Sequence, residues 1–155
     1  MYDDVLKTLV PMVKKYEGLA KLKKDGLVYP YVCPAGYPTQ GYGLLVKSLK
    51  EPPITPLEAE QRLWDSLPYY IEQTLILCPT LGTAPAPVLA AISDFTFNLG
   101  VARLRSSTLR RKIAVADWEA VCRELAKWVW GGGQRLPGLI TRRAEEAKLI
   151  RKETL

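Results

Sequence analysis

Apolar positions near the start of the chain follow the period of a helix. They recur at three- and four-residue steps and are Val5, Leu9, Met12, Val13 and Tyr16. This spacing places them on one face and predicts a helix over residues 3–16. Pro11 lies inside the pattern, and a proline inside a helix removes one backbone hydrogen bond, so we expect the helix to bend or shorten there.

The segment from Gly18 to Val46 loses the helical period. Lys24-Asp25-Gly26 has the composition of a hairpin turn, and a Pro- and Gly-rich stretch follows it and ends in Gly41-Tyr42-Gly43. Short alternating runs between such turns are typical of antiparallel strands. The pattern therefore predicts a small antiparallel sheet in the N-terminal part of the chain.

Helix start signals mark most of the remaining chain. Thr55-Pro56-Leu57-Glu58 is a capping box with proline at the first helical position, and it predicts a helix to about Leu77 with an interruption near Pro68. A connection over residues 80–87 precedes a mainly apolar helix from about Val88, which we expect to end at Gly100.

Three more helices are expected after Gly100. Ser106 or Ser107 can cap a short one that ends near Ala114, and Asp117 can cap another whose apolar stripe extends to Val129. Glycines 131–133 end that helix, and Pro137 opens the last one, over residues 137–152. The pattern predicts an α+β fold, with a helix and sheet over residues 1–54 and a helical lobe over 55–155, together forming one domain.

Composition narrows the possible chemistry. The chain has 155 residues, of which 48% are hydrophobic, and it contains no histidine. A composition this apolar argues against disorder. The absence of histidine excludes Ser-His-Asp triads, Cys-His pairs and His-ligated zinc. Acid and base catalysis would have to come from carboxylates, lysine, tyrosine or cysteine.

Charge and cysteine count bear on partners and compartment. The net charge of +6 suits nucleic acid, an anionic membrane or an acidic wall polymer, although short basic clusters are more often solvated faces than binding patches. Three cysteines, an odd number, argue against a disulfide framework and favour folding in a reducing cytoplasm. Charges in the first twenty residues exclude a signal-peptide core, and no apolar run approaches the roughly 18 residues of a membrane span.

One carboxylate, Glu17, stands at the expected junction of helix and sheet and directly precedes Gly18. The segments that follow it are Cys33-Pro34-Ala35-Gly36, Thr39-Gln40-Gly41-Tyr42-Gly43, Phe95-Thr96-Phe97-Asn98-Leu99-Gly100, Ser107-Thr108-Leu109-Arg110-Arg111-Lys112, Trp128-Val129-Trp130-Gly131-Gly132-Gly133-Gln134-Arg135-Leu136-Pro137-Gly138-Leu139-Ile140 and Arg142-Arg143-Ala144-Glu145. In their order and spacing they resemble the phage-type lysozymes, the glycoside hydrolase family of T4-like and lambdoid-phage endolysins. The resemblance spans about Glu17 to Leu149.

Two positions depart from the family pattern. Sixteen positions separate Glu17 from Cys33, more than the family usually has, and the extra residues fit best within Lys21–Pro30 as a longer hairpin. Leu44 stands where the family commonly has a histidine after Gly-Tyr-Gly, which we interpret as a change in packing.

The resemblance implies a lysozyme-like α+β fold with a cleft between its lobes, and a muramidase that hydrolyses the MurNAc–GlcNAc β-1,4 bond of peptidoglycan. Glu17 would be the general acid, and Cys33 and Thr39 would position or activate water, while Leu45 and Phe97 would line the sugar groove. An acid must hold its proton near neutral pH, which apolar surroundings favour. Cys33 as buried filler and Thr39 as an ordinary strand residue remain alternatives.

Further expectations concern the neighbours of this site and its partners. Tyr29 and Tyr31 either stack on sugars or pack the sheet, and at least one of Arg142 and Arg143 is expected at the surface. No cofactor or metal is implied. A phage or prophage endolysin would be a monomer made in the host cytoplasm, would reach the periplasmic wall through a holin-type pore, and would need no nucleic acid partner.

Two other functions stay open. A lytic transglycosylase would also use Glu17 but would expel the sugar's own hydroxyl in place of water. A non-catalytic basic module that binds cell wall or nucleic acid would not need the Glu17 carboxyl at all.

Overall fold

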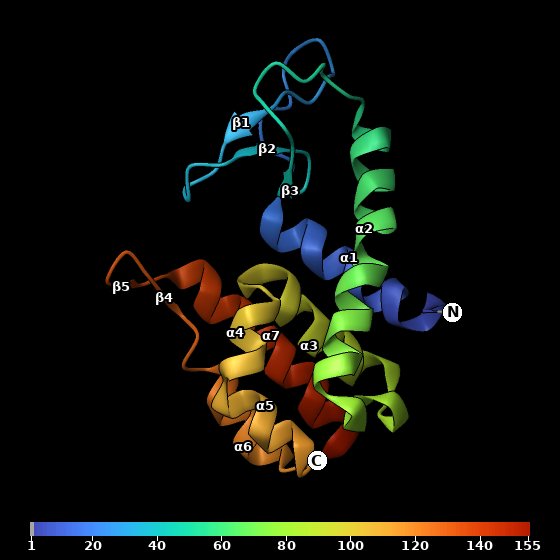
Figure 1. The fold of residues 1–155 in the computed structure, drawn as a ribbon, viewed down its shortest axis with the longest axis vertical. Helices are drawn as coiled ribbons and strands as arrows, with labels where there is room; N and C mark the ends of the chain where they lie inside the picture. The colour runs from blue at the N-terminus through green and yellow to red at the C-terminus, as the bar shows by residue number, and fades with distance from the viewer. Residues whose placement is uncertain (1) are drawn as a thin grey trace. The chain divides into compact units, whose positions relative to one another are not determined.

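The computed structural model describes residues 2–155 and confirms the α+β class. Most of the elements are helices, and a small three-stranded antiparallel sheet lies between the first two helices in the chain order (Figure 1). The chain forms two compact units: unit 1 comprises the start of the chain up to Leu9 together with Pro68–Leu155, and unit 2 comprises Val10–Leu67. These units differ from the expected lobes of 1–54 and 55–155 because their boundaries fall inside two helices. The expectation of one catalytic domain over 1–155 stays a prediction, and its first residue lies outside the described part.

Both of these helices continue through an internal proline. Helix α1 spans Asp3–Glu17 with Pro11 inside it, and α2 spans Pro56–Leu77 with Pro68 inside it. The expected shortening at Pro11 and the interruption at Pro68 are therefore wrong, while a bend at Pro11 stays a prediction. Buried residues flank each proline, among them Met12 and Leu67, and their burial offsets the lost backbone hydrogen bond.

Unit 2 contains the three-stranded sheet, in which β1 (Tyr31–Val32), β2 (Pro38–Gln40) and β3 (Leu44–Leu45) are antiparallel neighbours. The capping box at the start of α2 is confirmed, since the Glu58 backbone N–H donates to Thr55 Oγ1 at 3.1 Å. The expected turn at Lys24-Asp25-Gly26 is also confirmed: Leu22 bridges Val28, and the Gly26 N–H donates to the Lys23 carbonyl at 3.0 Å.

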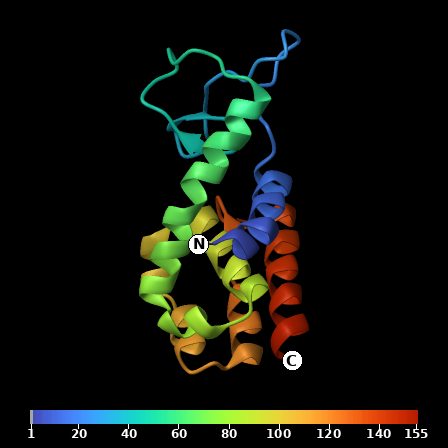
Figure 2. The same cartoon turned by 90° about the vertical axis from the view of Figure 1, so that its right-hand side faces the viewer.

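Unit 1 is a cluster of helices. After the 3₁₀ helix Pro79–Thr83 come α3 (Ala86–Leu99), α4 (Val101–Ser106), α5 (Thr108–Ala114), α6 (Trp118–Leu125) and α7 (Pro137–Thr154). Helix α7 packs along α3 and α6, as Figures 1 and 2 show. The caps at Ser107 and Asp117 are confirmed, because their side chains accept from the backbone N–H groups of Arg110 and Ala120.

Three features of unit 1 differ from the sequence-based expectations. A separate α4 follows Gly100, α6 ends at Leu125 before the expected Val129, and the glycine run forms a hairpin of β4 (Trp130–Gly131) and β5 (Gln134–Arg135). Gly132 and Gly133 both have positive φ, which the turn of this hairpin requires. The expectation that glycines 131–133 end the preceding helix is therefore wrong: α6 ends earlier, and the glycines reverse the chain in a hairpin.

Candidate active site

Glu17 is the last residue of α1. Gly18 follows in the left-handed region with φ +67°, and its N–H donates to the Lys14 carbonyl at 3.0 Å. Glycine adopts this conformation at little cost and is common where helices end. The Glu-Gly pair thus stops the helix directly after the carboxylate, and the Glu17 side chain remains partly exposed.

The Glu17 carboxyl group rests against Gly43, in the turn between β2 and β3. A Cβ atom built on Gly43 would lie 2.9 Å from Glu17 Oε2, so only a residue without a side chain leaves the carboxylate where it is. Gly43 also has φ +80°. The sequence places Gly43 in the Gly-Tyr-Gly motif but does not reveal this role, because its contact with Glu17 is made only in the folded chain.

The same turn is fixed to both helical segments of unit 2. A Cβ on Gly41 would lie 3.2 Å from the Ala59 Cβ of α2, so the turn packs closely on that helix. Lys14 of α1 pairs with Glu60 at 3.1 Å, and its Nζ stands 5.7 Å from the ring centroid of the buried Tyr42. These contacts hold the turn, and with it Gly43, in place beside Glu17.

Tyr31 connects Glu17 with the sheet. The pKa of its phenol is raised above the usual value, first by partial burial and then by the negative charges of Glu17 and Cys33. Tyr31 is also the direct cross-strand partner of Thr39, which in turn pairs with Leu45. The structure therefore brings Glu17, Cys33 and Thr39 to the same part of unit 2, with Tyr31 among them.

Cys33 follows β1 in the turn that leads to β2. Its N–H donates to the Tyr37 carbonyl at 3.0 Å, and its own carbonyl accepts from Gly36 at 2.8 Å. The pKa of the thiol is lowered, mainly by a hydrogen bond from the Tyr37 backbone and next by one from the Thr39 side chain. These contacts favour the thiolate, and the partial exposure of Cys33 leaves it accessible.

Thr39 is 2% exposed, and its hydroxyl donates to the Tyr37 carbonyl at 2.9 Å. A hydroxyl has one proton, so Thr39 cannot donate to Tyr37 and to a Cys33 thiolate at the same time. It can accept from the neutral thiol in its present orientation, and it would have to rotate to stabilise the thiolate. Thr39 is thus a buried hydroxyl whose hydrogen bonding depends on the protonation state of Cys33, and its role in positioning water stays a prediction.

The two expected groove residues lie in different units. Leu45 of β3 is 70% exposed, and several other large apolar side chains of the chain are exposed as well, so its exposure alone does not indicate a binding role. Phe97 belongs to α3 in unit 1, is partly exposed, and packs edge-on against Tyr70 with ring centroids 5.0 Å apart. A role for either residue in binding sugar stays a prediction.

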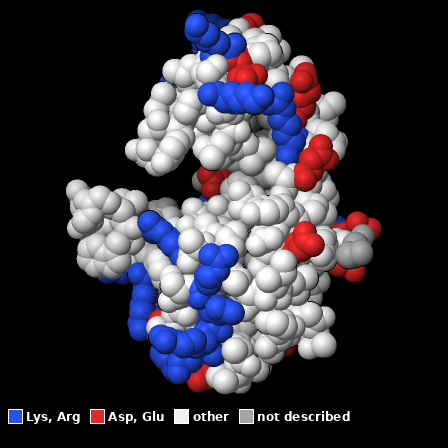
Figure 3. All heavy atoms as spheres, viewed as in Figure 1, with Lys and Arg blue, Asp and Glu red and all other residues white. Residues whose placement is uncertain are grey.

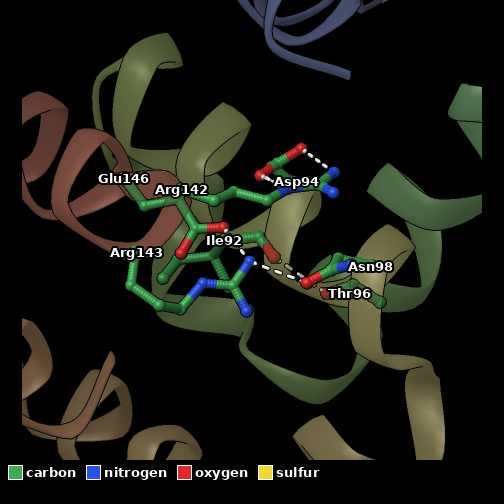
Figure 4. Close-up of polar contacts among 7 residues, drawn as sticks. All are labelled: Ile92, Asp94, Thr96, Asn98, Arg142, Arg143 and Glu146. Atoms are coloured by element: carbon green, nitrogen blue, oxygen red, sulfur yellow. Dashed lines mark hydrogen bonds and ion pairs between the residues drawn. The ribbon is translucent and has the colours of Figure 1, made fainter. Parts of the chain in front are cut away.

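Arg142 and Arg143 are both buried, at 3% and 1% exposure, so the expectation that at least one lies at the surface is wrong. Arg142 forms a bidentate pair with Asp94, with N···O distances of 2.8 and 2.7 Å. Arg143 donates to Glu146 at 2.7 Å and to Asn98 at 3.0 Å (Figure 4). Charged side chains of α3 and α7 thus form ion pairs inside unit 1. The sequence does not reveal this, because the paired residues of α3 and α7 are far apart in the chain.

Basic side chains gather on the face of unit 1 that carries α4 and α5 (Figure 3). Arg103, Arg105 and Arg111 are exposed there, as expected of solvated faces. The Arg110 side chain is instead held by a hydrogen bond, in which its Nε donates to the Leu77 carbonyl at 2.9 Å. Within residues 2–155, no cluster of metal-ligating side chains occurs and no helix is long and apolar enough to cross a membrane.

Replacing Gly43 by alanine should lower activity about 10²-fold. The thermal midpoint of this variant should fall little more than that of the control variant Gly26→Ala. The new methyl group would displace the flexible end of Glu17, and a misplacement of about 1 Å can cost that much in rate. Gly26→Ala is the matched control, since Gly26 has the same φ of +80° but nothing within 4 Å of its Cβ position. Lytic rate and thermal midpoint are measured together; equal rates in the two variants would contradict the placement of Glu17 against Gly43.

The three cysteines are free thiols and should differ in reactivity. Burial raises the pKa of Cys78 to about 11 and also raises that of Cys122, whereas the pKa of Cys33 is lowered. At pH 8 only about 0.1% of Cys78 would be thiolate. Iodoacetamide should therefore modify Cys33 first, which peptide mass spectrometry can follow over time. Equal labelling of the three thiols in the native protein would contradict this order.

Comparison with known proteins assigns the fold to a class and the chain to a family. The muramidase domain of SpmX from Asticaccaulis excentricus has the same fold, with a TM-score of 0.75 and 24% identity over 91% of this chain and 92% of that one. The active form of the P1 phage endolysin Lyz gives 0.75 and 21% identity over 99% of this chain and 85% of that one. The class is that of lysozyme-like α+β proteins.

The family model for phage lysozyme matches residues 14–146, and the chain belongs to this family. The endolysin of Acyrthosiphon pisum secondary endosymbiont phage 1 is 35% identical over 145 residues, which cover 90% of this chain and 92% of that protein. The SAR-endolysin of Bacteriophage PS119 is 39% identical over 62 residues, which cover 40% of this chain but only 37% of that relative. The expectation of a lysozyme is confirmed at the level of the family.

Proposed function

We propose that the protein is a muramidase that hydrolyses the MurNAc–GlcNAc β-1,4 bond of peptidoglycan and lyses the host cell as a phage or prophage endolysin. The single observation that carries the proposal is the placement of the Glu17 carboxylate against Gly43, next to Tyr31, Cys33 and Thr39. Family membership supports the same activity.

In the proposed mechanism Glu17 donates a proton to the glycosidic oxygen as the bond to the leaving sugar breaks. An inverting hydrolase then needs a water on the opposite face of the sugar. The Cys33 thiol and the Thr39 hydroxyl lie beside Tyr31 and supply acceptors that can orient this water. Because the contacts of Cys33 favour the thiolate, it can also accept the proton of the water.

The partners and compartment follow from this proposal. The exposed arginines of α4 and α5 would attract the anionic cell envelope, which makes peptidoglycan the natural partner of a chain with a net charge of +6. We further propose that the enzyme is a monomer, is made in the host cytoplasm, and reaches the wall in the periplasm through a holin-type pore.

The test is the clearing of Gram-negative cells whose outer membrane has been permeabilised. Turbidity should fall with time in proportion to enzyme concentration, and soluble muropeptides should appear as it falls. A protein that binds the cells but neither clears them nor releases fragments would be the non-catalytic wall-binding module, and the proposal would be abandoned. Fragments that all end in 1,6-anhydro sugars would favour a lytic transglycosylase.

Replacing Cys33 tests its share of the mechanism. Cys33→Ala should lower the lytic rate about 10²-fold, within the range of general acid–base terms. Cys33→Asp should retain more activity because a carboxylate can also orient and deprotonate water, and Cys33→Ser should fall between the two. Clearing of permeabilised cells measures all three variants. A wild-type rate in Cys33→Ala would remove the thiol from the mechanism.

A further inference from the structure

A pocket of about 560 Å³ opens beside the hairpin that precedes β1. Its polar lining consists of Lys21, Lys23, Tyr29 and Tyr31, and Pro30, Val32 and Leu49 add apolar surface. All of these residues belong to unit 2, so the pocket lies within one compact part of the chain. The hairpin is also the segment that makes the spacing between Glu17 and Cys33 unusually long.

The wall of this pocket is held by backbone pairing. Leu22 bridges Val28, which is fully buried and bridges Ile54 on its other side. The Tyr29 N–H donates to the Lys21 carbonyl at 3.1 Å. The backbone that carries Lys21 and Tyr29 is therefore ordered before a ligand binds, so that binding does not have to order this part of the chain.

Two ammonium groups give the pocket its positive charge. Lys21 is exposed, has φ +58°, which is uncommon for a residue with a side chain, and makes no side-chain hydrogen bond or ion pair within residues 2–155. The Nζ of Lys23 stands 4.0 Å from the Tyr29 ring centroid. Asp25, the nearby acid, does not line the pocket and accepts from the Tyr29 hydroxyl. The pocket thus offers cations above an aromatic surface to an anionic ligand.

Tyr31 joins this pocket to the candidate active site. Its side chain lines the pocket, and its phenol lies in the field of Glu17 and Cys33. The pocket is therefore close enough to the candidate site for a branch of a substrate bound beside Glu17 to enter it. In peptidoglycan, the group next to the scissile bond is the stem peptide of MurNAc, and it carries carboxylates.

We propose that the pocket binds a carboxylate-bearing part of the peptidoglycan stem peptide, with Lys21 and Lys23 as the charged contacts and Tyr29 and Tyr31 as the aromatic floor. The inference rests on the proposed muramidase function and deepens it, because it makes the peptide a determinant of substrate choice. Lysine suits this role as a compact cation that accepts carboxylates from many directions.

The test compares three proteins, the wild type and two double variants, on two substrates. Lys21→Gln/Lys23→Gln removes the charges of the pocket, and Lys24→Gln/Lys50→Gln removes the same charge from exposed sites that do not line it. Each protein cleaves purified peptidoglycan and peptidoglycan whose carboxylates have been converted to neutral methylamides. On the native polymer the pocket variant should need an about two- to twentyfold higher substrate concentration for half-maximal rate, since exposed charge pairs contribute up to about fivefold each. On the methylamide it should match the wild type.

Other results would overturn the proposal. An equal loss in the control variant would show a general attraction of charge, and an equal loss on both substrates would show that the pocket binds sugar. A binding experiment tests the pocket without catalysis. The isolated stem peptide is titrated into the protein, and the chemical shifts of Tyr29 and Tyr31 are followed by nuclear magnetic resonance. The shift changes should saturate in the wild type and be weaker in the pocket variant. A wild type that binds the peptide but cleaves no polymer would contradict the proposed function and leave the pocket assignment intact.

Discussion

Glu17→Gln should abolish the clearing of permeabilised cells, with a rate at least about 10²–10⁴-fold below that of the wild type. Glutamine keeps the size and hydrogen-bonding shape of the side chain against Gly43 but has no acidic proton to give to the leaving oxygen. The fold should be unchanged, because Glu17 lies at the end of α1 and is partly exposed. Turbidity and circular dichroism together measure both effects.

The matched control for this change is Glu72→Gln. Glu72 is exposed in α2, and its replacement alters the net charge by the same amount at a distance from the motif residues in the sequence. It should clear cells at the wild-type rate. If Glu17→Gln cleared cells as fast as Glu72→Gln, Glu17 could not be the general acid.

Arg143→Met should lower the free energy of unfolding by about 3–5 kcal/mol, the usual cost of removing one partner from a buried ion pair. Arg143 and Glu146 are 1% and 0% exposed, and Asn98 would also lose a donor. Burial raises the pKa of Glu146, so its carboxyl depends on Arg143 for its charge. The thermal midpoint should fall by roughly 6–20 °C.

A double variant separates the ion pair from simple packing. Arg143→Met/Glu146→Leu replaces both charged groups with apolar ones and should recover most of the lost stability, because no charge is left buried alone. Arg151→Met, an exposed change in the same helix, should leave the midpoint within a few degrees of the wild type. If the double variant were less stable than Arg143→Met, the pair would be a net source of stability.

The features that the sequence predicted correctly are those that depend on hydrogen bonds between residues close together in the chain. The Thr55–Glu58 capping box and the Asp117 cap need only neighbouring residues, and both form as expected. The glycines at 132 and 133 are compatible with two structures, since a glycine run can end a helix or form the turn of a hairpin. In the folded chain they form a hairpin turn. Pro11 and Pro68 gave wrong expectations of where the helices end. The hydrogen bond that each proline removes is offset by the burial of neighbouring side chains.

The candidate site was predictable only in part. Glu17, Cys33 and Thr39 came from a motif resemblance, and the contacts around Tyr31 place them in one region of unit 2. The roles of Gly43 and Tyr31 depend on residues distant in sequence, so no local pattern could reveal them. The same holds for Arg143, whose partner Asn98 lies 45 positions away.

The most direct test of the central claim is cleavage of purified peptidoglycan in ¹⁸O-labelled water, followed by mass analysis of the fragments. Hydrolysis adds one water across the broken MurNAc–GlcNAc bond, so the account predicts new reducing ends on MurNAc that carry the label. Unlabelled 1,6-anhydro ends, each one water lighter, would contradict it, as would labelled reducing ends on GlcNAc alone.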